Sequence, residues 1–490
     1  MLDREQMVTE IAQEVIARLS QQPATPVRAT PRPAPRPVAP RPPGIALGDG
    51  VFRTVDDAVQ AAATAQERVA AMTLGERGRI VETIKRLCED HKQELGRAEL
   101  EETKIGRLED KIAKLEAIKD VLGVEAMRTE ARSDASGLCL VEHAPWGVVG
   151  MVLPATHSAP TLASNAINVI AAGNTAVFSP HPAGARVAAR ALQMFNREIQ
   201  RATGVANVLT TMAEPSIEAA GQIFHHPDVA LLTVTGGPVV VREAMKAGKR
   251  VIAAGPGNPP VVVDETACLD RAAESIIEGG GFDNNLLCIA EKEVFVVESV
   301  FADFMAAMRR AGARELDGPA IERLSEAAFE IEAGKGVGCG QAHLKRDLVG
   351  KDASVLAEAA GVHVPGNTVM LFGETAEDHP FVQVEQMMPF MPIVRVRDVD
   401  AGIAAAVRAE HGYRHTAIIH SRNVENVTKM AKALNTTLVV QNAPCTAALG
   451  TGAPSYLSFS IATPTGEGVT TPMTFTRERQ LTVTGALRIH

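Results

Sequence analysis

Short apolar runs alternate with longer helix-like segments between residues 148 and 253, and few folds accept such an order. The runs at residues 148–153, 175–178, 205–210, 229–234 and 250–253 have the length and apolar content of buried strands. The segments at residues 161–172, 185–197, 216–224 and 239–247 have the composition of helices. Buried strands joined by crossover helices form a parallel sheet with helices on both faces. We therefore predict an α/β fold here, and a second α/β unit from Pro259 to about Thr446.

The loops that follow these strands are candidates for a ligand site, because open parallel sheets bind ligands at the carboxyl ends of their strands. Each loop holds glycine or proline: Pro-Ala-Thr-His at 154–157, Ser-Pro-His-Pro at 179–182, Thr-Gly-Gly-Pro at 235–238 and Ala-Gly-Pro-Gly at 254–257. The dinucleotide fingerprint G-x-G-x-x-G is absent from the sequence. Gly236 and Gly237 precede a predicted helix and can still present amides to a phosphate, although Pro238 removes one donor.

One cysteine, Cys288, follows a glycine-rich bend and precedes an apolar run that we predict to be a strand. The small backbone of Gly279, Gly280 and Gly281 is expected to let a planar carbonyl approach the thiol, which favours thiolate chemistry. The alternative for any one of the six cysteines is a free thiol buried as a small hydrophobic group. We also expect Phe282, Leu286 and Leu287 to form a small apolar pocket.

Composition excludes several classes of function. A chain of 490 residues with 46% hydrophobic content can bury more than one core, so we expect at least two domains. The net charge of −9 and the scattered basic residues argue against nucleic acid as a partner. The longest apolar runs are far shorter than a membrane span, so we expect a soluble protein that does not enter a membrane.

The cysteines and histidines do not predict a metal site. The six cysteines stand far apart without a C-x-x-C pair, and no secretory signal opens the sequence, so we expect a reducing cytoplasm. His411 and His415 are four residues apart, with His420 beyond them, and on a helix this spacing can hold a metal. The sequence from Tyr413 to His420 instead favours a loop that enters a strand, so ordinary hydrogen-bonded histidines are expected.

The first 44 residues differ in character from the rest of the chain. Residues 1–20 place apolar side chains at steps of three and four, which predicts a short amphipathic helix. Residues 21–44 are dense in proline and arginine and are expected to form an extended linker. So short a helix is marginal alone, so we expect it to fold against a partner that covers its apolar stripe. The alternative is an unstructured tail with accidental periodicity.

The body is expected to begin near Ile45, with a helix start at Thr54 and long helices to about Arg128. We predict a cofactor domain at 45–253, of which 132–147 contributes to an oligomerisation arm, and a catalytic domain at 254–446 that carries Cys288. Residues 447–490 are expected to form a return segment and a terminal strand. Its alternating run, residues 481–484, suits an exposed edge that pairs with another subunit.

This body resembles the aldehyde dehydrogenase superfamily along nearly its whole length. The landmarks, in the expected order, are Glu102-Thr-Lys104, residues 154–158, Thr235-Gly-Gly237, Asn258-Pro259, Cys288 and Glu385-Gln-Met-Met-Pro389. Residues 177–182, 255–266 and 282–293 more narrowly resemble the CoA-acylating propionaldehyde dehydrogenases of bacterial microcompartments. The resemblance implies an aldehyde dehydrogenase-like fold with a parallel-sheet cofactor domain, an α/β catalytic domain and a small β arm, and a dimer or tetramer.

The same resemblance implies roles for particular residues. Cys288 is the expected nucleophile, and Glu385 the acid that holds the nicotinamide-side ribose. The implied cofactor-binding set is Thr156, Ser179, Pro180, His181, Thr235, Gly236, Gly237, Gly255 and Glu385, and the implied substrate set is Phe282, Asn284, Asn285 and Leu287. His157 replaces the family's usual oxyanion-binding asparagine, so two roles stay open for it: donor to the oxyanion, or base toward an incoming thiol.

One replacement separates two reactions. Hydrolytic aldehyde dehydrogenases carry a glutamate five residues before the Asn-Pro pair, where it activates water, and here that position is Ala253. Without this base the acyl-enzyme is expected to wait for a thiol, so the resemblance implies NAD and coenzyme A as cofactors and propanal as the first-choice aldehyde. A hydrolytic enzyme, an acylating enzyme for acetaldehyde and a non-catalytic scaffold are the alternatives. The helix of residues 1–20 resembles an encapsulation peptide, which implies a microcompartment lumen.

Overall fold

A computed structural model describes residues 44–331 and 342–487. The described residues from Ile45 onward belong to one unit. The helix predicted over residues 1–20 lies outside the described residues, as does nearly all of the linker predicted over residues 21–44.

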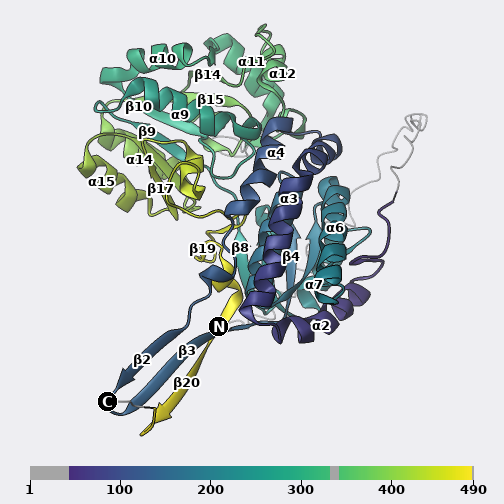
Figure 1. Cartoon of the computed structure of the whole chain (residues 1–490). Coiled ribbons are helices and arrows are strands. Elements are labelled where there is room, and N and C mark those ends of the chain that lie inside the picture. The colour runs from purple at the N-terminus through teal and green to yellow at the C-terminus, as the bar shows by residue number, and fades with distance from the viewer. Residues whose placement is uncertain (1–43, 332–341, 488–490) are drawn as a thin grey trace, which may run out of the picture. The chain divides into compact units, whose positions relative to one another are not determined.

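The first predicted sheet is confirmed as a parallel sheet (Figure 1). Its strand order is β1-β6-β5-β4-β7-β8, and every neighbouring pair runs parallel. The strands are β1 Val51–Phe52, β4 Val148–Leu153, β5 Thr175–Pro180, β6 Leu209–Met212, β7 Val229–Thr235 and β8 Arg250–Ala254. The strand predicted over 205–210 begins later, because Asn207 adopts a left-handed conformation with φ 58° that interrupts extended backbone.

Helices cover both faces of this sheet. The helices are α2 Val55–Ala70, α3 Leu74–Thr103, α4 Leu108–Glu116, α5 Ser158–Ala171, α6 Ala185–Thr203, α7 Ile217–His225 and α8 Pro238–Met245. Side chains of α3, α5 and α6 form one core with the sheet, and those of α2, α7 and α8 form another. The predicted start at Thr54 is confirmed, since its hydroxyl accepts a hydrogen bond from the Asp57 amide and caps α2.

The second α/β unit is also confirmed. Its parallel sheet has the order β11-β14-β15-β10-β9-β16-β17. The strands are β9 Pro260–Val263, β10 Glu293–Val297, β11 Arg314–Glu315, β14 Leu371–Glu374, β15 Phe390–Val396, β16 Thr416–His420 and β17 Leu438–Gln441. The helices are α9 Leu269–Gly281, α10 Phe301–Arg310, α11 Gly318–Ala328, α12 Ala353–Ala359, α13 Pro380–Gln383, α14 Val399–Ala409 and α15 Val424–Leu434.

A three-stranded antiparallel sheet joins two distant segments of the chain. Strand β3, Gly137–Pro145, lies between β2, Glu130–Asp134, and β20, Thr476–Thr484 (Figure 1). The side chains of β20 are mostly exposed, and Leu481 is 59% exposed at its edge. The pairing of this edge with another subunit stays a prediction. Two smaller antiparallel pairs are β12 Phe329–Ile331 with β13 Ala342–Leu344, and β18 Ile461–Ala462 with β19 Gly468–Val469.

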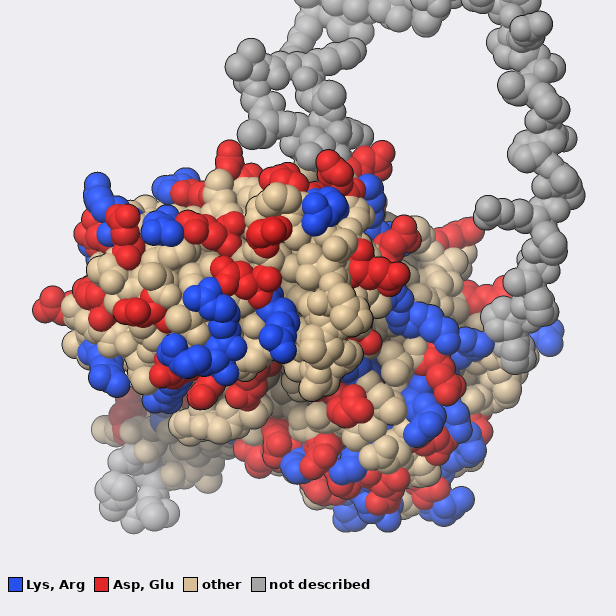
Figure 2. All heavy atoms as spheres, turned by 90° about the horizontal axis from the view of Figure 1, so that it is seen from above, with Lys and Arg blue, Asp and Glu red and all other residues tan. Residues whose placement is uncertain are grey.

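Basic and acidic side chains are interspersed on the face seen in Figure 2. None of the helices in the described part of the chain has the length and apolar content needed to cross a membrane. Within the same residues, no group of three or more His, Cys, Asp or Glu side chains is placed to hold a metal ion.

Candidate active site

Cys288 lines a cavity of about 310 Å³ between α4, the loop after β4, the turn before β10 and the segment after β17. Its apolar walls are Ala113, Ala117, Phe282, Leu287, Ile289, Leu449, Leu457, Phe459 and Ile461. His157 and Lys114 also line it, and exposed or partly exposed charged side chains stand at its rim: Glu116, Lys119, Asp120 and Glu278. Two of the predicted reactive side chains therefore share one largely apolar cavity.

The turn that leads to Cys288 has an unusual backbone. Asp283, Asn284 and Asn285 are consecutive, buried and left-handed, with φ values of 46°, 56° and 66°. Such conformations are costly for residues other than glycine and persist only where neighbours hold them. The Asn284 amide donates to the Gly350 carbonyl at 3.0 Å, and the Asn285 amide donates to the carbonyls of Gly280 and Glu291 at 2.9 and 2.8 Å.

These contacts divide the predicted substrate set. Phe282 and Leu287 line the cavity as expected, but Asn284 and Asn285 are not among its lining residues. Their amides are used to hold the turn. Leu286, expected in the apolar pocket, is also absent from the cavity and packs instead toward Gly350.

The interpretation of the glycine run was wrong. Gly279, Gly280 and Gly281 are buried at the end of α9, where a Cβ would collide with Glu291, Met391 and Val369 respectively. The missing side chains therefore make room for the protein's own atoms, and not for an approaching carbonyl. The aldehyde must reach the thiol from the cavity side.

The environment of Cys288 keeps its thiol protonated at rest. Burial, and then the Glu385 carboxylate, raise the pKa of this thiol to about 12, and the buried Lys292 ammonium opposes both effects. Glu385 is partly buried, its own pKa is raised by burial, and the Gly257 amide donates to its carboxylate. Lys292 is fixed close by, because its Nζ donates to the Asn285 carbonyl at 2.8 Å. The thiolate must therefore form during the reaction.

His157 presents a free ring nitrogen. The residue caps α5 and is 5% exposed, its Nε2 lies 3.5 Å from the Thr156 hydroxyl, and its Nδ1 is buried without a hydrogen-bond partner. Burial, and then the Lys114 and Lys111 ammonium groups, lower the pKa of this imidazole well below its usual range. A neutral imidazole with an unpartnered nitrogen can donate one hydrogen bond.

The predicted cofactor loops come together at the carboxyl edge of the first sheet. Ser179 and Pro180 end β5 beside Val152 and Leu153 of β4, and Thr235 ends β7 beside Ala254 of β8. These neighbouring strand ends place the loops around Thr156, His181, Gly236 and Gly255 along that edge. Apart from Glu385, which lies on the second unit, the predicted set is therefore arranged along one edge of the first sheet, where open parallel sheets bind ligands.

The start of α8 fits a dinucleotide phosphate. Gly237 caps this helix without a side-chain hydrogen bond, is exposed, and has nothing within 4 Å of where a Cβ would lie. An uncapped helix N-terminus that a ligand can approach closely is suited to a phosphate, although Pro238 contributes no donor. On the second unit, Glu385 keeps acceptor capacity for vicinal hydroxyls beyond its contact with Gly257.

Ala253 offers no base to the cavity. It is fully buried in the core beneath α7 and α8, and its amide donates to the Thr465 hydroxyl at 3.0 Å. The carboxylates that do line the cavity, Glu116, Asp120 and Glu278, stand at exposed or partly exposed positions on its rim.

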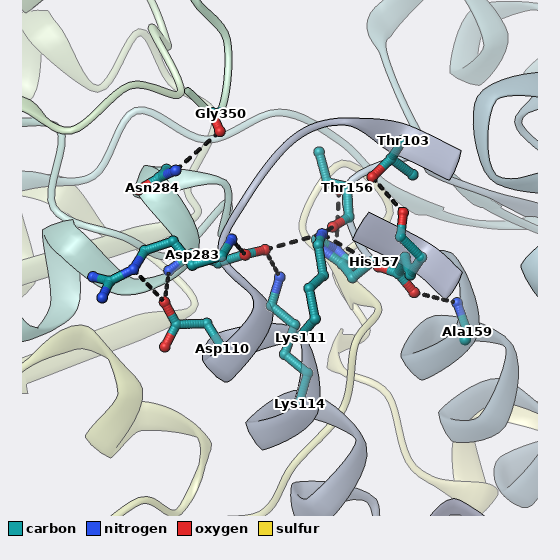
Figure 3. Close-up of polar contacts among 12 residues, drawn as sticks. Thr103, Asp110, Lys111, Lys114, Thr156, His157, Ala159, Asp283, Asn284 and Gly350 are labelled. Atoms are coloured by element: carbon teal, nitrogen blue, oxygen red, sulfur yellow. Dashed lines mark hydrogen bonds and ion pairs between the residues drawn. The ribbon is translucent and has the colours of Figure 1, made fainter. Parts of the chain in front are cut away.

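Sequence reasoning missed several groups around the site. Lys114 lines the cavity, and it belongs to a buried ionic cluster with Glu99, Lys111 and Asp283 (Figure 3). No motif marks these residues; the available signal was two lysines three residues apart among apolar residues of a short helix.

His415 was expected to be an ordinary hydrogen-bonded histidine, and its ring does form a hydrogen bond with the Thr416 hydroxyl at 2.8 Å. Burial lowers its pKa to about 4. It packs with the Cys288 carbonyl against Gly257.

A parallel cofactor sheet, a second α/β unit and a cysteine in an apolar cavity between them are the parts of a dehydrogenase that acts through a covalent thioester. The model of the aldehyde dehydrogenase family matches residues 49–454, so the chain belongs to that family. The resemblance drawn from the sequence is thereby confirmed.

Individual relatives are similar over most of their length. Acetaldehyde dehydrogenase (acetylating) EutE of Salmonella typhimurium is 45% identical over 444 residues, which cover 90% of this chain and 93% of that protein. A propionaldehyde dehydrogenase of Rhodopseudomonas palustris, solved with bound CoA and an acylated cysteine, is 40% identical with a TM-score of 0.86, covering 91% and 100% of the two chains. A propionaldehyde dehydrogenase from the Clostridium phytofermentans fucose utilisation bacterial microcompartment is 39% identical, also with a TM-score of 0.86, over 90% and 100%.

Proposed function

We propose that this chain oxidises a short aldehyde, propanal in the first place, with NAD and coenzyme A to give acyl-CoA, NADH and a proton. The observation that carries the proposal is that Cys288 and a neutral His157 share an apolar cavity whose carboxylates are confined to its rim. Among the described residues that line this cavity there is no buried carboxylate to activate water, so an acyl group on sulfur is expected to persist until a thiol arrives. A relative that is an acetylating acetaldehyde dehydrogenase, and a similar structure with bound CoA and an acylated cysteine, support the same reaction.

The first step is addition of the Cys288 sulfur to the aldehyde carbon, with release of the thiol proton to water and formation of a thiohemiacetal oxyanion. The Cys288 backbone N–H and the free ring nitrogen of His157 are the two proposed donors to that oxygen. The depressed pKa of His157 favours the donor role over the base role, because a group so weakly basic accepts a proton poorly at neutral pH.

Residues on the carboxyl edge of the first sheet would hold the cofactor. The N-terminus of α8, with Gly236 and Gly237, would bind the pyrophosphate, and Glu385 the ribose next to the nicotinamide. Thr156, Ser179, Pro180, His181, Thr235 and Gly255 would line the rest of the cleft. When bound, the nicotinamide supplies the hydride acceptor. Coenzyme A is proposed to use the same cleft and to take the acyl group from Cys288, which returns the thiol.

The cavity favours an apolar substituent on the aldehyde. Phe282, Leu287, Phe459 and Ile461 surround space that one more methylene group can occupy. Burying a methylene contributes about 0.8 kcal/mol, so propanal is expected to exceed acetaldehyde in kcat/KM by about fourfold. Oxidation of acetaldehyde to acetyl-CoA is the alternative within the same chemistry, and the relative EutE is an acetylating acetaldehyde dehydrogenase.

A reaction with NAD, with and without CoA, tests the proposal. Without CoA, propanal is expected to give a burst of no more than one NADH per subunit and a propionyl adduct on the peptide that contains Cys288. CoA should then release propionyl-CoA and restore steady turnover. Cys288→Ala is the control and should give neither burst nor adduct. Continuous release of propionate without CoA, at the rate seen with CoA, would instead identify a hydrolytic enzyme.

The location of the protein is proposed from the same likeness. A similar dehydrogenase comes from a bacterial microcompartment, which supports a microcompartment lumen as the site of action. Residues 1–20 are proposed to contact the shell or other cargo, and the exposed edge of β20 is proposed to join subunits into a dimer or tetramer.

A further inference from the structure

Four charged side chains are buried together beside the cavity, and we call them the lysine clamp: Glu99, Lys111, Lys114 and Asp283. None is more than 2% exposed. The Lys111 Nζ lies 3.3 Å from Glu99 Oε1 and 3.2 Å from Asp283 Oδ2, and Lys114 is paired closely with the same Asp283 oxygen. Figure 3 shows both lysines reaching from α4 toward Asp283. Two cations face two anions, so the cluster is balanced in charge.

One side of the clamp holds the backbone around His157. The Lys111 Nζ donates to the Thr156 carbonyl at 2.8 Å, immediately before His157. The Ala159 amide donates to Glu99 Oε2 at 3.0 Å, two residues after it. His157 is therefore fixed from both sides by residues of α3 and α4 (Figure 3).

The other side holds the left-handed turn that leads to Cys288. The carboxylate of Asp283 accepts from the Arg107 amide at 2.8 Å as well as from the lysines, and the Asp283 amide donates to Asp110 Oδ2 at 2.9 Å. Lys114 also reaches the cavity, where its Nζ lies 5.9 Å from the centroid of the Phe282 ring.

Fold stability alone is a weak reason for such a cluster. Removing four charges from water is expensive, and well-packed apolar side chains often stabilise a fold equally well or better. What an apolar set does not supply is a directed hydrogen bond to the Thr156 carbonyl and a common anchor for two separate turns. The clamp connects the loop that carries His157 to the turn that carries Cys288.

We infer that Lys111 and Lys114 are positioning residues for the acylation step: through Thr156 and Asp283 they hold His157 and Cys288 in the mutual placement that the reaction needs. The inference rests on the role proposed above for His157. The Thr156 hydroxyl and the Phe459 ring lie against its ring, and the two ammonium groups act on it electrostatically. Both ammonium groups lower the pKa of His157, and Lys114 also lowers that of Cys288 against the opposing effects of burial and Glu385.

The main test is the double variant Lys114→Met/Asp283→Asn, which removes one cation and one anion. Lys111 and Glu99 stay paired, so no uncompensated charge is buried. Lys114→Gln keeps a donor for Asp283 but leaves one buried carboxylate without its cation, so it is the less stable of the two and tests the loss of the charge alone. Lys92→Met is the matched control, because Lys92 also joins α3 to α4 through an ion pair, at 3.2 Å to Glu116, but on the exposed side.

The NADH burst with propanal is measured without CoA over a range of pH, beside thermal unfolding. In the double variant and in Lys114→Gln the burst rate should fall by about tenfold or more, since small misplacements of reacting groups have effects of this size. The KM for propanal should change by less than about twofold. In Lys114→Gln the rise of the burst rate toward alkaline pH should move to higher pH, because Lys114 lowers the pKa of the Cys288 thiol and its removal raises that pKa. The double variant should move this rise in the same direction by less. Lys92→Met should match the wild type in rate and pH profile.

If folded Lys114 variants have the burst rate and pH profile of the wild type, the positioning role inferred for the lysine clamp is wrong. A loss of rate that follows thermal unfolding alone, with an unshifted pH profile, would also contradict it. His157→Ala separates the two proposals. If it slows the burst while the lysine variants do not, only the clamp fails; if it leaves the burst unchanged, the role of His157 and the clamp fall together.

Discussion

The replacement of His157 by alanine tests the role of oxyanion donor proposed for this side chain. The His157 Nδ1 is buried and has no hydrogen-bond partner, and the Nε2 has only a 3.5 Å contact with Thr156. The ring therefore has a donor to give to the oxyanion. Loss of one preorganised oxyanion donor costs about 10²–10³ in rate, or about 2.7–4 kcal/mol. The lower value, about 10²-fold, is expected here because the Cys288 amide stays in place.

Two assays locate the step that is lost. The NADH burst without CoA reports acylation of Cys288, and a chase of the acyl-enzyme with CoA reports acyl transfer to the thiol. In His157→Ala the burst should slow by about 10²-fold, while the chase changes much less. His157→Asn should recover most of the burst rate, because its amide can donate to the same oxygen.

The pH dependence gives an independent check. Burial, Lys114 and Lys111 hold the pKa of His157 well below 6.5, so the ring is neutral throughout the neutral range. The wild-type burst should therefore show no acid limb near pH 6.5. Instead it should rise toward alkaline pH, since burial and Glu385 raise the pKa of Cys288 to about 12. A wild-type burst in His157→Ala refutes the donor role, and a loss confined to the chase would make His157 the thiol base.

Two further replacements separate the functions of other site residues. The Glu385 carboxylate raises the pKa of the Cys288 thiol, so Glu385→Gln should lower that pKa and speed alkylation of Cys288 by iodoacetamide at a given pH. The same replacement should raise the KM for NAD. Slower alkylation would contradict the electrostatic effect. Asn285→Ala removes hydrogen bonds to two backbone carbonyls and to Lys292, and it forces alanine into a left-handed conformation with φ 66°. The free energy of unfolding should therefore fall by about 3–5 kcal/mol, while the KM for propanal stays unchanged. A raised KM at unchanged stability would return Asn285 to the substrate set.

The parallel sheets were predictable because their strands are short, apolar and separated by helical segments of regular length. The strand predicted over 205–210 was misplaced because the left-handed backbone at Asn207 depends on local turn geometry, which apolar content does not report. Cys288 and Glu385 were identified by their place in a series of motifs and not by any local periodicity. Such motifs locate a reactive atom but say little about which side of it is open.

The errors around Cys288 share one physical cause. Gly279, Gly280 and Gly281 signal close approach of something, and sequence alone does not tell whether that is a ligand or the protein's own Glu291 and Met391. Asparagine is equally ambiguous, since the same amide that suits a substrate also suits a left-handed turn with carbonyls to satisfy. Asn284 and Asn285 are buried within the turn, which shows that their amides hold the backbone. This burial depends on the tertiary fold and cannot be read from the sequence.

The lysine clamp could not be predicted from the sequence for a related reason. On a helical wheel Lys111 and Lys114 resemble the solvated side of a short amphipathic helix, and this is the usual place for lysine. They become buried because α4 packs with α3 and lies against the turn at Asp283, whose carboxylate comes from 169 residues further along the chain. Because unpaired charges cannot be buried cheaply, the presence of Asp283 and Glu99 is what allows lysine at these positions. A mutation at any one of the four should therefore be judged by the charge it leaves unbalanced, and only then by the contact it removes.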